Sequence, residues 1–102
     1  MQIANAQAAD GPTSEYAYLG TRQNGKINIY VTGALGGGTL ALQAQAPDGS
    51  YADLQTVPVG MTVFESAPAA YRLNLAGATA PSFSAWIEDD SEYTQDLVRG
   101  RV

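Results

Sequence analysis

The chain has 102 residues, which is enough for one domain and too few for two. It contains no cysteine and no histidine, which excludes disulfides and Ser-His-Asp or Cys-His catalysis and argues against a zinc site. A formal net charge of −5 argues against binding to nucleic acid or to an anionic membrane. We therefore expect a binding or assembly domain, with no enzyme activity and no cofactor.

Residues 1–14 are predicted to form an N-terminal arm outside the domain. Alanine and glutamine in residues 1–9 favour a short helix, but an isolated helix of this length is marginal in water. Asp10-Gly11-Pro12 then breaks any regular structure. The arm is expected either to be disordered or to become ordered on a neighbouring subunit. It lacks the basic and apolar regions of a signal peptide, so we expect synthesis in the cytoplasm of the cell that makes the protein.

From residue 15 onward, apolar and polar residues alternate with the period of two that is typical of half-buried strands. The residues between the strand patterns are turn formers, among them a Pro-Asp-Gly-Ser turn at residues 47–50. The predicted strands are residues 27–32, 39–46, 71–76 and 83–88, with weaker ones at 15–19, 51–57 and 61–65.

About seven short strands predict an all-β fold, a small antiparallel β-sandwich of jelly-roll or immunoglobulin-like topology. The sandwich is expected to span residues 15–92, and residues 93–102 are expected to form a last strand or a C-terminal tail. The glycines at residues 36–38 are expected to form a structural turn. A phosphate-binding loop would open a helix, whereas Thr39 opens a predicted strand.

An acidic cluster lies near the end of the last predicted strand. Carboxylates can hold Ca²⁺, but their spacing here does not match an EF-hand, and a solvated acidic loop that protects a sheet edge is the favoured alternative. A carboxylate pair for glycoside hydrolysis is disfavoured, because adjacent side chains on one loop rarely face each other at the required separation. No metal site is therefore assigned to the cluster, which comprises Glu88, Asp89, Asp90, Glu92 and Asp96.

Several aromatic residues fall on the polar side of the predicted strands, notably Tyr30 and Trp86. Exposed aromatic rings stack on sugars or anchor protein interfaces. The other interpretation is that these rings pack in a second layer of the core, and the sequence leaves both open.

Two segments resemble a signature of short virion proteins of tailed bacteriophages: GTLALQAQAPDGS at residues 38–50 and YRLNLAGATAPS at residues 71–82, followed by FSAWI. The resemblance covers about half the chain and implies a capsid cement or decoration protein on the virion surface. It implies the major capsid protein as partner and a homo-oligomer, with a trimer favoured. It implies no catalytic residues.

We expect the two chain ends and the outward aromatic residues to contact the partner. Alternatives are a carbohydrate-binding module that uses Tyr30, Trp86 or Tyr51, and a head–tail or tail structural protein of the same fold. The predicted partner-binding residues are Ile3, Asn5, Gln7, Tyr16, Tyr30, Trp86, Tyr93, Leu97, Arg99 and Arg101.

Overall fold

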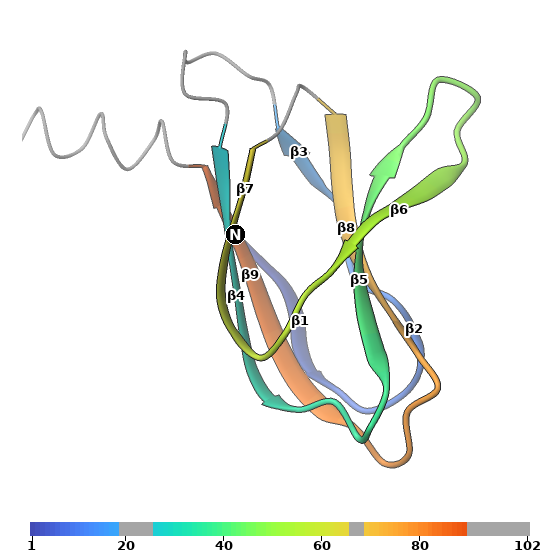
Figure 1. Cartoon of the computed structure of the whole chain (residues 1–102), viewed down its shortest axis with the longest axis vertical. Coiled ribbons are helices and arrows are strands. Elements are labelled where there is room, and N and C mark those ends of the chain that lie inside the picture. Colours follow the sequence, from blue (N-terminus) through green and yellow to red (C-terminus); the bar gives the residue numbers. More distant parts are fainter. Residues whose placement is uncertain (19–25, 66–68, 90–102) are drawn as a thin grey trace, which may run out of the picture.

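The computed structural model describes residues 1–18, 26–65 and 69–89, and every regular element in these ranges is a β-strand (Figure 1). The strands are β1 (Gln2–Gln7), β2 (Gly11–Pro12), β3 (Tyr16–Tyr18), β4 (Lys26–Ala34), β5 (Thr39–Gln45), β6 (Tyr51–Thr56), β7 (Gly60–Glu65), β8 (Ala69–Ala76) and β9 (Ser82–Asp89).

The strands form two antiparallel sheets that lie face to face (Figure 1). Sheet A has the order β1-β9-β4-β7, and sheet B has the order β2-β8-β5-β6, with β3 also paired to β8. If β2 and β3 are counted as one interrupted strand, this is the connectivity of a jelly roll. The predicted small antiparallel β-sandwich is therefore confirmed, with jelly-roll topology.

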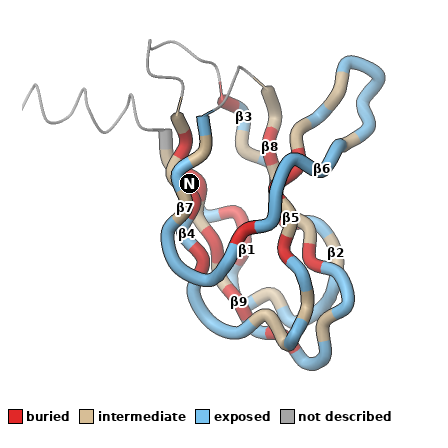
Figure 2. Tube along the Cα trace, in the orientation of Figure 1, coloured by how far each residue is buried: buried red, intermediate tan, exposed pale blue. Residues whose placement is uncertain are grey.

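All seven strands predicted from the alternating pattern are present, with bounds within two residues of those expected. The pattern works because one face of each central strand is buried between the sheets, as the buried positions in Figure 2 show. The fully buried side chains include Ile27, Ile29 and Val31 of β4, Phe83 and Ile87 of β9, Leu40 and Leu42 of β5, and Leu73 and Leu75 of β8.

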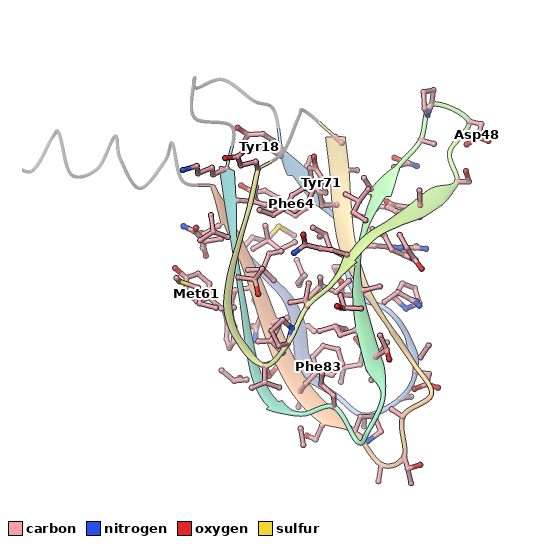
Figure 3. All side chains as sticks on the ribbon, in the orientation of Figure 1. Tyr18, Asp48, Met61, Phe64, Tyr71 and Phe83 are labelled. Atoms are coloured by element: carbon pink, nitrogen blue, oxygen red, sulfur yellow. The ribbon has the colours of Figure 1, made fainter. Side chains whose placement is uncertain are left out.

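An aromatic pair links the two sheets near one end of the sandwich. Phe64 of β7 and Tyr71 of β8 meet edge to face, with ring centroids 6.3 Å apart (Figure 3). The pair fixes the inner face of β7, so that the alternate residues of that strand point away from the core.

The prediction of an N-terminal arm is wrong for residues 2–7, which form β1 at the edge of sheet A. Ile3 is only 3% exposed, and Ala4 is also buried. Burial of these side chains overrides the helix propensity of the surrounding alanines and glutamines. The alternating pattern missed β1 because its pairing with β9 contains two register shifts.

Residues 10–13 then carry the chain from sheet A to sheet B and hold it there. The backbone N–H of Thr13 donates to the carbonyl of Leu73 at 2.8 Å, and the Leu73 N–H donates to Thr13 Oγ1 at 3.0 Å. The Asp10 carboxylate accepts from the N–H groups of Gly77 and Ala78, each at 3.1 Å. The N-terminal segment is therefore part of the domain and does not hang free of it.

The glycine-rich connector between β4 and β5 is a structural turn, as predicted. Gly36 has φ = 63°, and a Cβ there would lie 2.3 Å from the carbonyl oxygen of Thr79. Only glycine allows the two loops to approach this closely. Thr39 begins β5 and not a helix.

The role of β1 in the core gives a direct test by mutation. Ile3→Ala should lower the free energy of unfolding by about 2–4 kcal/mol, because it leaves a cavity under β1. The control Asn5→Ala changes an exposed residue of the same strand and should alter stability by less than about 0.5 kcal/mol. Urea denaturation measures both values, and equal stability of Ile3→Ala and the unaltered protein would contradict this placement.

Candidate functional site

A row of large side chains crosses the outer face of sheet A. Trp86 of β9 lies opposite Tyr30 of β4, and Tyr30 lies opposite Met61 of β7. Val63 follows on the same face of β7, opposite Asn28. Tyr30, Met61, Val63 and Trp86 are hereafter called the sheet A patch.

The patch is exposed even though its members are apolar or aromatic. Met61 is 60% exposed, Val63 49% and Tyr30 37%, while Trp86 is half-buried. Residues directly opposite on neighbouring strands have Cβ atoms only about 4.5–5.5 Å apart, so the patch is contiguous. Figure 3 shows Met61 pointing away from the sandwich, whereas Phe64 of the same strand points into it.

The core determines this orientation. Ile29 and Ile87, the buried neighbours of Tyr30 and Trp86 along their strands, lie opposite each other on the inner face. Because successive side chains of a strand point to opposite faces, burial of the isoleucines turns both aromatic rings outward. The patch is therefore positioned by the most buried part of the fold.

Polar residues surround the patch. Lys26 lies opposite Glu65 at one end of the β4–β7 pair, and Thr32 lies opposite Ser84 at the other end of the β4–β9 pair. Glu88 accepts a hydrogen bond from the α-amino group of Met1 at 2.6 Å. An apolar centre with a polar rim is the usual anatomy of a protein–protein interface.

The outer face of sheet B differs, because its polar groups bond to one another. Arg72 Nε donates to Gln43 Oε1 at 2.8 Å, and Gln43 Nε2 donates to Asp53 Oδ1 at 2.7 Å. The Arg72 guanidinium also lies 3.7 Å from the centroid of the Tyr51 ring. This network ties β8, β5 and β6 together and covers one face of Tyr51.

The structure brings together two of the predicted contact residues, Tyr30 and Trp86. It corrects a third, because Ile3 is buried in the core and presents no surface to a partner. Asn5 is exposed. Gln7 is half-buried, and its side-chain Nε2 donates hydrogen bonds to the carbonyls of Ala9 and Gly11.

Tyr16 is half-buried and packs against the core. The predicted contact residues Tyr93, Leu97, Arg99 and Arg101 lie outside the described residues.

Sequence reasoning missed Met61 and Val63. Apolar side chains occupy both faces of β7, with Phe64 inside and Met61 and Val63 outside. The local sequence pattern therefore did not show which face of the strand is buried. Only the pairing with β4 assigns these two residues to the outer face.

Within the described ranges, no three acidic side chains lie close enough to share a metal ion. Of the predicted acidic cluster, only the Glu88 side chain is described, so the calcium alternative stays a prediction. Among the same residues, no helix has the length and apolar character that crossing a membrane requires.

Comparison with known proteins gives no match to a family model, to a curated protein or to a solved structure. The function therefore has to be inferred from the surface of the domain itself.

Tyr51 allows a test of the sheet B network by pH. Burial of its hydroxyl raises the pKa of Tyr51, the Glu15 carboxylate raises it further, and Arg72 opposes the shift. Above the ordinary tyrosine pKa of about 10, the unfolded chain loses this proton while the folded chain keeps it, so stability falls as pH rises. Tyr51→Phe removes the hydroxyl and keeps the ring under Arg72.

The expected result is that the stability difference between the unaltered protein and Tyr51→Phe is constant below about pH 9 and shrinks or reverses above about pH 10. Urea denaturation at a series of pH values measures it. A difference that does not change across this range would contradict the buried position of the hydroxyl.

Proposed function

We propose that the protein is a structural protein of a bacteriophage virion, of the capsid cement or decoration class. It binds the outer surface of the capsid and bridges neighbouring capsid subunits. The observation that carries the proposal is the sheet A patch, a contiguous exposed apolar surface on a domain with a formal net charge of −5. The resemblance of residues 38–50 and 71–82 to virion proteins supports the same class.

The patch has the properties that attachment to a preformed shell requires. Tyr30 and Trp86 lie on β4 and β9, the central strands of sheet A, whose other faces form the core. A surface fixed in this way loses little conformational entropy on binding. Tyrosine and tryptophan are also the residues that most often dominate the energy of protein interfaces.

The proposal includes no catalytic role and no cofactor. Tyr30 is the only titratable member of the patch, and the chain has no histidine or cysteine to act with it. The sequence predicted the N-terminal arm as a segment that contacts the partner. The proposal assigns that contact to the sheet A patch instead. Deleting residues 2–13 would remove β1 and Ile3 from the fold, so loss of binding by that variant would report unfolding.

Two substitutions test the attachment surface. Trp86→Ala and Tyr30→Ala should each weaken binding to purified capsids by about 2 kcal/mol or more, a loss of roughly thirtyfold, if these rings are central to the interface. Leu54→Ala is the matched control, because Leu54 is an exposed apolar residue of β6 in the other sheet.

Co-sedimentation of each folded variant with capsids that lack the protein measures its occupancy. Near-normal occupancy of both patch variants, or an equal loss in Leu54→Ala, would contradict attachment through sheet A.

A second candidate function is carbohydrate binding. The adjacent rings of Tyr30 and Trp86 favour it, since sugar rings stack on exposed aromatic side chains. Tyr51 does not extend this platform, because it belongs to the other sheet and Arg72 covers one of its faces. Met61 and Val63 beside the rings favour a protein partner instead.

A glycan array separates the two candidates. Binding to a sugar that is lost in Trp86→Ala and kept in Leu54→Ala would establish the carbohydrate module. If the folded, unaltered protein binds no sugar on the array, carbohydrate binding is excluded as a function.

A further inference from the structure

The described part of the chain has four sheet edges, and an unprotected edge can pair with another chain. Three of the edges carry features that oppose such pairing. β1 has two register shifts, and the β2–β3 edge is interrupted and contains Pro12. β6 has a register shift against β5 and carries Asp53 near its middle.

The fourth edge, β7, has none of these features. It pairs with β4 over Gly60–Glu65 without a register shift, and it contains no proline. No charged residue occurs between Val59 and Phe64. Met61 and Val63 are exposed on its outer face. β7 is thus a regular and largely apolar edge strand whose only charged residue is the terminal Glu65, and such an edge is the kind that pairs with another strand.

We propose that β7 pairs antiparallel with β7 of a second copy of this chain. The pairing joins the two copies of sheet A into one continuous sheet across a two-fold axis, as in other isologous interfaces. A second copy is the occupant that the charges favour, because an antiparallel pair of β7 strands keeps the two Glu65 side chains at opposite ends of the pair. Two β6 strands would place Asp53 near its own copy. The inference does not rest on the proposed capsid function.

The side chains also indicate the register of the pairing. Directly opposite residues of an antiparallel pair share a face, so the two-fold axis lies midway between one residue and the same residue of the second copy. An axis between the two Thr62 residues sets Met61 opposite Val63 of the second copy, apolar against apolar. It sets Glu65 opposite Val59 and far from the other Glu65. An axis between the two Val63 residues would instead set Met61 opposite Glu65.

This arrangement joins the two sheet A patches without covering them. Edge-to-edge pairing uses backbone groups, so the outer faces stay open, and an axis perpendicular to the sheet leaves both facing the same way. The pair is a dimer and not the trimer that the resemblance implies. It presents two equal attachment surfaces on one side.

Lysine substitutions on β7 test the pairing. Met61→Lys with Val63→Lys changes two exposed side chains and sets lysine opposite lysine at both pairs of the interface. The dissociation constant of the dimer should rise by at least about a hundredfold, since opposed like charges cost several kcal/mol. Leu54→Lys places one lysine on the β6 edge and should leave the dimer intact.

Charge reversal tests the register. Met61→Glu with Val63→Glu should also prevent self-association, and mixing it with the double-lysine variant should give a heterodimer, because each lysine then lies opposite a glutamate. Sedimentation equilibrium measures all masses against the monomer mass of 10.7 kDa. Circular dichroism verifies that each variant is folded.

The predicted result is a dimer of the unaltered protein, monomers of each double variant alone and a dimer of their mixture. If the unaltered protein stays monomeric at concentrations up to about 1 mM, the proposal is overturned. This outcome includes the case in which residues 90–102 of the same chain cover β7. An oligomer that persists in the double-lysine variant would overturn it too, by showing that association uses another surface.

Discussion

The packing of the inner faces of the two sheets is the interaction on which the rest of the structure depends. Buried isoleucine, leucine and valine side chains on β4, β9, β5 and β8 form a single core. Their burial sets the register of every central strand, because a shift of one residue would turn each of them to solvent. The outward positions of Tyr30 and Trp86 follow directly from this register. The orientation of the proposed attachment surface is thus set by the core beneath it.

The two outer faces of the sandwich have opposite character. On sheet B, the hydrogen bonds of Gln43 with Arg72 and Asp53 satisfy the polar groups within the domain. On sheet A, the apolar patch has no such partner in the described part of the chain. This asymmetry is the physical reason to assign binding to sheet A. A pairing of two copies through β7 would double the patch on one side, which favours bridging between neighbouring sites on a shell.

The strands of the core were predictable from sequence because burial on one face leaves a period of two, as in Ile27, Ile29 and Val31. β1 was not, because its register shifts remove that period and only contact with distant strands buries Ile3. The pairing of Tyr30 with Trp86 could not be predicted from the sequence either. The sequence placed each ring on the polar side of its strand. The strands that carry the two rings are far apart in the chain, and only the topology makes them neighbours.

Imaging of the particle by electron cryomicroscopy would test the central claim most directly. The account predicts density for this domain on the outer surface of the capsid, with sheet A facing the shell and Trp86 and Tyr30 in the contact. Density that turns sheet B toward the shell, or particles that lack the domain altogether, would contradict it.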